Sequence, residues 1–211
     1  NFVFSSTASV YGIPQYIPMD EDHPTDPINY YGETKLQIER NLKWFSELRG
    51  IRFAALRYFN AAGYDVKGRI RGKEKNPQNL IPIVMEVASG VRSKMEIFGN
   101  DYKTQDGTGV RDYIHVNDLA TAHVQAMEYI SNTKEDIVVN LATGNGHSVL
   151  DVIHKTIEVS GNDIPYDIVG RRTGDPGTVL AVSKKAFALL NWSPGHSDLD
   201  TLIRSAWEVY R

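Results

Sequence analysis

The chain has 211 residues, of which 41% are hydrophobic and 10% are aromatic, so it can bury a sizeable core in one or two globular domains. Its formal net charge of -3 leaves no basic field that would favour nucleic acid or an anionic membrane surface. The absence of cysteine excludes disulfides, thiol catalysis and Cys-ligated zinc, and it fits a reducing compartment such as the cytoplasm. No apolar run approaches the roughly 20 residues that a membrane-spanning helix needs.

The first part of the chain predicts a βαβ unit. Residues 1–6 form an apolar run typical of a buried strand, and prolines keep residues 12–29 irregular. A helix is predicted from Tyr31 to a left-handed cap at Gly50, because its apolar residues follow helical spacing. Residues 51–60 are a second continuous apolar run, as in a parallel strand that is covered on both faces. This order implies a right-handed crossover and a parallel sheet.

Beyond this unit the chain changes character. Residues 61–77 are rich in glycine and charge and predict a loop, after which short helices and strands interleave without a repeat. Asn117 and Asp118 are predicted to cap the helix that begins there. The predicted helices cover 79–88, 117–130, 149–159, 183–190 and 199–210, and the predicted strands cover 95–98, 113–116, 137–141 and a segment near Asp167.

The predicted fold class is therefore α/β. We expect residues 1–62 to be the last βαβ part of a Rossmann-type doubly wound parallel sheet that binds a dinucleotide, and residues 63–211 to form mainly a smaller α/β substrate-binding lobe. The chain starts within the first predicted strand and without an initiator Met. We therefore expect it to be the carboxyl-terminal portion of a longer protein.

The stretch NYYGETKLQIERNL, residues 29–42, places Tyr31 and Lys35 on one face at the start of the predicted helix. An unperturbed tyrosine is a phenolate in roughly one molecule per thousand at neutral pH. An ammonium about 5 Å away, at an effective dielectric constant of about 20, stabilises a phenolate by roughly 3 kcal/mol. The pair is thus suited to general-base catalysis, although this spacing also arises by chance in many helices.

The strand before that helix adds specificity. FSSTASVYG places the hydroxyls of Ser5, Ser6 and Thr7 at the carboxyl end of a predicted parallel strand, where α/β sheets bind their ligands. The alternative is a Ser/Thr loop that merely ends a strand. Hydroxyls at a strand end followed by Tyr-x-x-x-Lys at the next helix are more specific than either feature alone.

At these residues the sequence resembles the extended short-chain dehydrogenase/reductases and, within them, the UDP-glucose 4-epimerases (UDP-galactose 4-epimerases). The resemblance extends over essentially the whole chain. It rests on SSTASVYG (5–12), YYGETK (30–35), LRYFNAAG (56–63), NLIP (79–82), IFGNDYKTQDGTGVRDYIHVNDLA (97–120), NLATGNGHSV (140–149) and GRRTGDP (170–176).

The resemblance implies an NAD-dependent isomerase of galactose and carbohydrate metabolism that inverts carbon 4 of a UDP-hexose by transient hydride transfer. Tyr31 would take the proton of the sugar 4-hydroxyl. Lys35 would make the phenol more acidic and hold the nicotinamide ribose, and Thr7 would hydrogen-bond the reacting oxygen. The implied cofactor contacts are Ser5, Ser6, Tyr31, Lys35 and Tyr58.

The resemblance also implies the nucleotide-sugar contacts. Two arginines suit a diphosphate because a guanidinium binds phosphate oxygens bidentately, and an acid suits ribose hydroxyls or the orientation of an arginine. Without the motif, each arginine would be expected to be a solvated surface residue. The implied contacts are Thr7, Asn60, Asn79, Leu80, Phe98, Arg111, Arg172, Asp175 and Val179.

Val179 departs from the pattern of some family members. It falls at a position where those members carry a bulky tyrosine that excludes N-acetylated sugars. A smaller side chain leaves more room, so we expect UDP-GlcNAc and UDP-GalNAc to be interconverted as well as UDP-glucose and UDP-galactose.

Two alternatives stay open. A nucleotide-sugar 4,6-dehydratase of the same family would need acidic residues directly after the hydroxyl residue, where this chain has Ala8 and Ser9. A non-catalytic fragment is the other, because the Gly-rich dinucleotide turn is absent from the 211 residues. A chain limited to these residues would be expected to lack activity alone, and its intact mass and nicotinamide content would decide between the cases.

Other motifs point away from metal chemistry. His115 and His123 lie eight residues apart and no His-Glu-x-x-His occurs, so we expect no metal site. GTGVRD and GNGHSV are Gly-rich without a phosphate-binding fingerprint, and we expect turns there. Apolar residues on more than one face of the Tyr31 helix, including Trp44, lead us to expect a homodimer.

Overall fold

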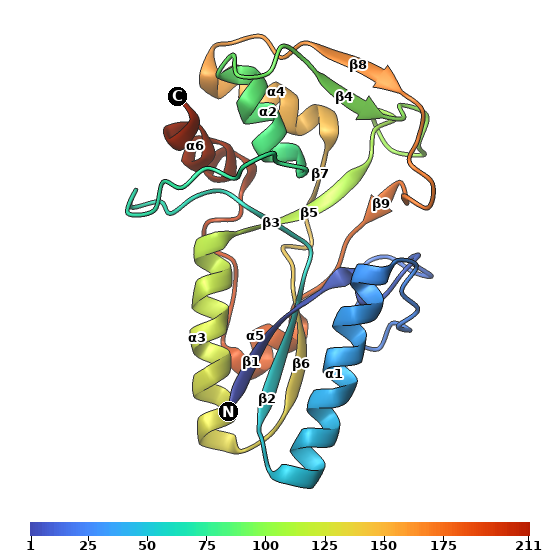
Figure 1. The fold of residues 1–211 in the computed structure, drawn as a ribbon, viewed down its shortest axis with the longest axis vertical. Coiled ribbons are helices and arrows are strands. Elements are labelled where there is room, and N and C mark those ends of the chain that lie inside the picture. The colour runs from blue at the N-terminus through green and yellow to red at the C-terminus, as the bar shows by residue number, and fades with distance from the viewer.

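A computed structural model describes residues 1–211. Its helices and strands form two regions, one above the other in the view of Figure 1. The lower region contains a parallel sheet of three strands in the order β1–β2–β6. Their bounds are β1 (Phe2–Thr7), β2 (Phe53–Tyr58) and β6 (Ile137–Leu141). This sheet confirms the predicted α/β class and the parallel pairing.

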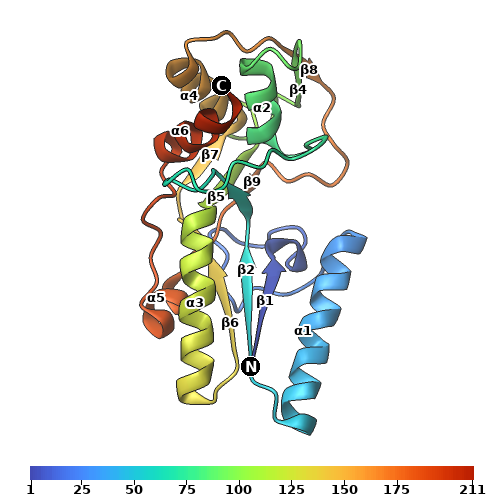
Figure 2. The ribbon, with the colours of Figure 1, turned by 60° about the vertical axis from the view of Figure 1, so that its left-hand side comes forward.

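Helices cover both faces of this sheet (Figure 2). The helix α1 (Tyr30–Arg49) lies on one side, and α3 (Val116–Thr133) with the short α5 (Lys184–Leu190) lies on the other. The arrangement follows from the apolar run of β2, whose residues 53–57 are all buried. A strand that is covered on both faces needs such a continuous run.

The upper region holds the remaining strands and helices. A small sheet has the order β3–β5–β7, with β9 paired to β5, and a separate parallel pair joins β4 to β8. Three helices, α2, α4 and α6, pack together over these strands in one apolar cluster. The bounds are β3 (Asn60–Ala62), α2 (Leu80–Ala88), β4 (Met95–Phe98), β5 (Val110–His115), β7 (Gly146–Ser148), α4 (Val149–Ser160), β8 (Tyr166–Val169), β9 (Thr178–Val179) and α6 (Leu199–Tyr210).

The chain passes from the lower to the upper region at β3, next to the domain boundary expected at residue 62. The chain nevertheless returns to the lower region with α3, β6 and α5, which pack in one apolar cluster against β2. The lower region is therefore built from segments that are distant in the sequence. None of the helices combines the length and the apolar character needed to cross a membrane.

Three predicted details are wrong. The helix α3 begins at Val116 and is capped by His115, whose ring accepts from the Asn117 N–H at 3.0 Å, so Asn117 and Asp118 lie inside its first turn. The turns expected in GTGVRD and GNGHSV are confined to their first residues, because the former runs into β5 at Val110 and Gly146–Ser148 of the latter pairs with β5 as β7. The loop expected after residue 60 begins only after the short strand β3.

The start of α1 is fixed by its neighbours. Asn29 caps the helix by accepting from the Gly32 N–H at 2.8 Å, and Gly50 ends it in the left-handed conformation with a φ of 67°. Gly32 packs directly on the 3₁₀ turn η1 (Ala8–Val10), where an added Cβ would lie 2.4 Å from the Ser9 carbonyl oxygen. Only glycine permits this approach, which holds the helix start against the end of β1.

Gly32→Ala should therefore destabilise the protein by about 1–3 kcal/mol, because a backbone oxygen cannot move aside as a flexible side chain can. Urea denaturation of the variant and the parent measures this difference. Gly72→Ala is the control, since an added Cβ there meets nothing within 4 Å. Equal unfolding free energies for the Gly32 variant and the parent would contradict the packing described here.

Candidate functional site

Tyr31 and Lys35 face the same space at the carboxyl end of β1. The Lys35 ammonium lies 5.6 Å from the centre of the Tyr31 ring and 5.0 Å from the centre of the Phe4 ring. It donates a hydrogen bond to the Ser5 carbonyl oxygen at 2.9 Å. The Tyr31 side chain is open to solvent, with 53% of the residue exposed. The phenol is therefore neither buried in apolar packing nor turned away from the cation.

A buried ion pair orients the helix that carries them. Glu39, one turn beyond Lys35, receives the guanidinium of Arg57 from β2, with Nε 3.0 Å from Oε1. The Ser6 hydroxyl of β1 donates to the same carboxylate. Burial alone would lower the pKa of Arg57, but the bond to Glu39 outweighs it and the pKa is raised, so the guanidinium remains charged. The pair thus ties α1 to both strands.

The predicted hydroxyl residues have partners within the chain. Thr7 is buried, and its hydroxyl accepts from the Ser9 N–H at 3.2 Å and so caps η1. The Ser5 hydroxyl lies 2.8 Å from Nε2 of His123, and the Ser6 hydroxyl is bonded to Glu39 as above. The structure therefore brings all three to the strand end beside Lys35, and each hydroxyl already has a partner within the chain, since Thr7 also donates to the Ser9 hydroxyl at 3.3 Å.

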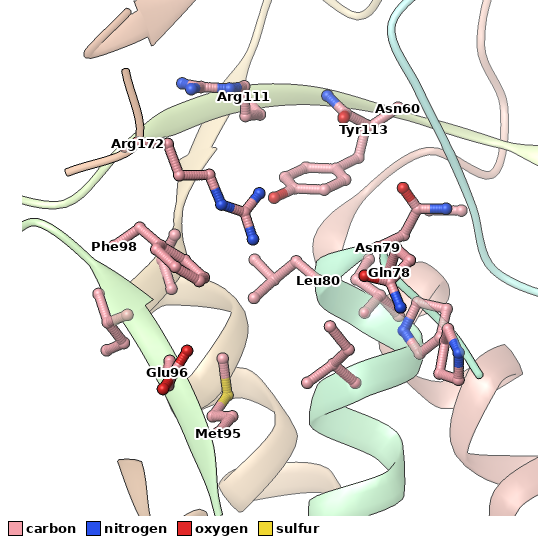
Figure 3. Close-up of a pocket in the computed structure, with 18 of the residues that line it drawn as sticks. Asn60, Gln78, Asn79, Leu80, Met95, Glu96, Phe98, Arg111, Tyr113 and Arg172 are labelled. Atoms are coloured by element: carbon pink, nitrogen blue, oxygen red, sulfur yellow. The ribbon is translucent and has the colours of Figure 1, made fainter. Parts of the chain in front are cut away.

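A cavity of about 590 Å³ opens in the upper region between β3, α2, β4 and β5 (Figure 3). Its size is typical of small-molecule sites. It brings together most of the predicted nucleotide-sugar residues, although they come from five separate segments of the chain. Its lining includes Asn60, Asn79, Leu80, Phe98, Arg111, Arg172 and Asp175, whereas Thr7, Tyr31, Lys35 and Val179 are not part of it.

The two arginines of the cavity differ in their environment. Arg111 on β5 is paired with Asp175 and donates to the Val110 carbonyl oxygen at 2.8 Å, so its position is fixed. Arg172 has no ion-pair partner and stacks on the Phe98 ring, with its guanidinium carbon 3.8 Å from the ring centre. In Figure 3 the Arg172 guanidinium extends into the cavity. Arg172 is thus the cation available to an anionic ligand.

Tyr113 was not predicted but lines the same cavity. It lies two residues after Arg111 on β5, and alternate residues of a strand share a face, so the spacing could have revealed it. In Figure 3 its hydroxyl is directed toward Arg172. Burial raises the pKa of Tyr113, so its phenol stays protonated and can donate a hydrogen bond.

Val179 lies between the cavity and the strand end. On β9 it stands opposite Arg111 in the pairing with β5. On its other side it packs against the apolar cluster that contains Val10 and Tyr11, next to the 3₁₀ turn. It therefore links the cavity to the region of Thr7, although it lines neither the cavity wall nor the Tyr31–Lys35 pair.

Asp112 supports this wall from behind. Its carbonyl oxygen accepts from the Asn60 side chain at 2.8 Å, and its buried carboxylate accepts from the N–H groups of Thr143 and Gly144, both at 3.0 Å. Burial raises the pKa of Asp112 to about 6, and these hydrogen bonds only partly oppose the effect. Above that pH the Asp112 side chain is ionised, and its burial destabilises the folded protein.

Because the pKa of Asp112 is higher in the folded than in the unfolded protein, its protonated form stabilises the fold. This contribution is fully present below the unfolded pKa of about 3.9 and is lost as the pH rises through about 6. Between pH 4 and pH 6 this group should therefore lower the free energy of unfolding by about 3 kcal/mol at most. Urea denaturation across that range should show the component in the parent and not in Asp112→Asn. Identical pH dependence in both proteins would contradict it.

The described chain contains no cluster of three or more His, Asp or Glu that could hold a metal ion.

Residues 1–142 match the NAD dependent epimerase/dehydratase family. A UDP-glucose 4-epimerase of Halalkalibacterium halodurans is 48% identical over 210 residues, which are 99% of this chain and 63% of the relative. The chain thus spans less than two thirds of the length of that relative.

Solved structures agree with this assignment. The UDP-glucose 4-epimerase from Brucella ovis in complex with NAD superposes with a TM-score of 0.96 at 40% identity, covering 99% of this chain and 64% of that one. The UDP-Glc/GlcNAc 4-epimerase from Campylobacter jejuni superposes with a TM-score of 0.82 at 39% identity, covering 99% and 64%. The two regions described above therefore occur together in enzymes of this kind.

Proposed function

The chain belongs to the NAD dependent epimerase/dehydratase family, and from that membership we propose that the protein carrying it interconverts UDP-hexoses that differ at carbon 4. UDP-glucose and UDP-galactose are the proposed substrates, and NAD is the proposed cofactor. The relatives of similar sequence and structure that support this choice are UDP-glucose 4-epimerases.

One observation carries the proposal within the chain. Tyr31 is exposed at the lip of the lower region, and an ammonium lies 5.6 Å from its ring centre. The phenol is thus open to a bound sugar and stands beside a cation. Tyr31 can then accept the proton of the sugar 4-hydroxyl as a general base and return it after inversion.

The residues at the strand ends fit a nicotinamide nucleotide. The Lys35 ammonium and the half-buried ring of Tyr58 lie at the carboxyl ends of β1 and β2, where parallel sheets bind dinucleotides. When bound, NAD supplies a reversible hydride acceptor for carbon 4. Lys35 would hold the ribose, and Thr7 would donate a hydrogen bond to the sugar oxygen that loses its proton.

The cavity fits the UDP group. Arg172 carries a charge without an ion-pair partner, and Arg111 is held in place by Asp175, so the two can bind a diphosphate without reorganising. Asn60 and Tyr113 add hydrogen-bonding groups on the same wall. A nucleotide held there would leave its hexose free to reach past Val179 toward Tyr31.

The dehydratase alternative has less support. Directly after Thr7 the turn η1 carries Ala8, Ser9 and Val10. An elimination needs an acid and a base at this place, and no carboxyl group is present in the turn.

We infer a cytoplasmic location from the lack of cysteine, which suits a reducing compartment.

Tyr31→Phe should abolish turnover of UDP-galactose and leave UDP-hexose affinity within about twofold, because the cavity is unchanged and only the proton acceptor is lost. Steady-state kinetics and isothermal titration with UDP-galactose measure the two effects. Tyr30→Phe is the matched control, since Tyr30 is 86% exposed on the preceding helical position and should keep full activity. Simultaneous loss of binding in the Tyr31 variant would indicate a structural role.

We propose that the small side chain of Val179 also admits N-acetylated hexoses, as in the similar UDP-Glc/GlcNAc 4-epimerase from Campylobacter jejuni. Val179→Tyr should then lower kcat/KM for UDP-GlcNAc by at least about tenfold more than for UDP-glucose, because added bulk excludes the acetamido group. Kinetics with both sugars decide this. A parent enzyme that does not turn over UDP-GlcNAc would refute the extension.

We also propose that the protein forms a homodimer through α1. Trp44, Phe45 and Leu48 are 62%, 52% and 72% exposed on this helix, an unusual concentration of large apolar side chains. Light scattering at micromolar concentration should give twice the chain mass, and Trp44→Glu should give a monomer. Phe187→Glu on α5 is the control, because Phe187 is 61% exposed outside this surface. A monomeric parent would contradict the proposal.

A further inference from the structure

His123 on α3 belongs to no predicted site, yet it contacts the strand end that holds the catalytic pair. Its Nδ1 lies 2.7 Å from the Leu119 carbonyl oxygen, and its Nε2 lies 2.8 Å from the Ser5 hydroxyl. A carbonyl oxygen can only accept, so Nδ1 must carry the ring proton. In the neutral ring Nε2 is then the acceptor, and the Ser5 hydroxyl donates to it.

The alternation of β1 explains why this contact reaches Lys35. Phe4 packs with Leu42 of α1, and the Ser6 hydroxyl bonds Glu39 of α1, so these two side chains face α1. Successive side chains of a strand point to opposite faces. Ser5 accordingly directs its hydroxyl to α3, while its carbonyl oxygen receives the Lys35 ammonium at 2.9 Å.

Residue 5 is therefore held from both sides of the sheet. His123 fixes its side chain, and the bound carbonyl oxygen fixes the ammonium beside the Tyr31 ring. The His123 ring is itself anchored, because Leu119 lies one turn earlier on the same helix and the Tyr58 ring centre lies 6.4 Å away. The contact with α3 and the contact with the Lys35 ammonium of α1 therefore meet at one residue, Ser5.

We propose that His123 is a positioning residue for the epimerisation, acting through Ser5 to hold Lys35 beside the Tyr31 ring. This inference rests on the proposed function of Tyr31 and Lys35. It concerns the rate of the proton transfer and not the binding of the UDP group, because His123 lies outside the cavity lining.

The test uses the NAD-loaded protein with UDP-galactose and compares His123→Phe with His123→Gln. The phenyl ring keeps bulk but cannot accept from Ser5, so kcat should fall roughly tenfold, the effect of one lost hydrogen bond. KM and the bound NAD content should stay unchanged. His123→Gln, whose amide oxygen can accept the bond, should restore most of kcat.

Ser5→Ala provides the second arm. It removes the donor of the same contact, so its loss of kcat should equal that of His123→Phe, and the double variant should be no worse than either single variant. His154→Gln is the control for substitution of a helical histidine, since His154 is exposed on α4. Additive losses, or a rise of KM that parallels the loss of kcat, would overturn the inference.

A readout without turnover separates this inference from the proposed function. Nitrogen NMR of histidine-labelled protein should show His123 as the neutral tautomer with the proton on Nδ1, and Ser5→Ala should shift its Nε2 signal. A proton on Nε2 would overturn the inference. An intact contact in a protein that epimerises no UDP-hexose would refute the proposed function and with it the positioning role.

Discussion

The buried ion pair between Glu39 and Arg57 is the interaction on which the site depends. Lys35 and Glu39 lie one turn apart on α1 and face the same strands, so the carboxylate that bonds Arg57 fixes the rotation of the helix about its axis. Such a pair contributes little net stability, because desolvation offsets the attraction, but loss of one partner leaves an unpaired buried charge at a cost of about 3–5 kcal/mol. Its effect here is to hold the Tyr31–Lys35 face of α1 toward the strand ends.

Under the proposed function, the upper region binds the nucleotide and the lower region transfers the proton. The cavity of the upper region has one arginine already paired with Asp175 and one free on an aromatic ring, which suits a fixed diphosphate. The lower region presents Tyr31 on the first turn of a helix whose start is packed on backbone at Gly32. Val179 pairs with β5 at Arg111 and packs on the cluster of Val10 and Tyr11, and under the proposed function the size of this side chain would select the sugar.

Much of this was accessible from the sequence, because long apolar runs and helical spacing predict the main strands and helices, and the motifs predict residues that the fold gathers in one cavity. The strands β3, β7 and β9 were missed, since two or three residues carry too little periodicity to be recognised. The contact between Ser5 and His123 spans 118 residues, and no local pattern reveals such a partner. The sequence also could not show which side chains of β1 face α1 and which face α3, because that depends on which helix covers each face of the sheet.

The most direct measurement is a crystal structure of the protein with NAD and a UDP-hexose. The expected result places the diphosphate against Arg172 in the cavity and sets oxygen 4 of the sugar within hydrogen-bonding distance of both the Tyr31 and the Thr7 hydroxyls. A UDP group in the cavity with its hexose directed away from α1, leaving the phenol without a contact to the sugar, would contradict the assignment of Tyr31 as the base.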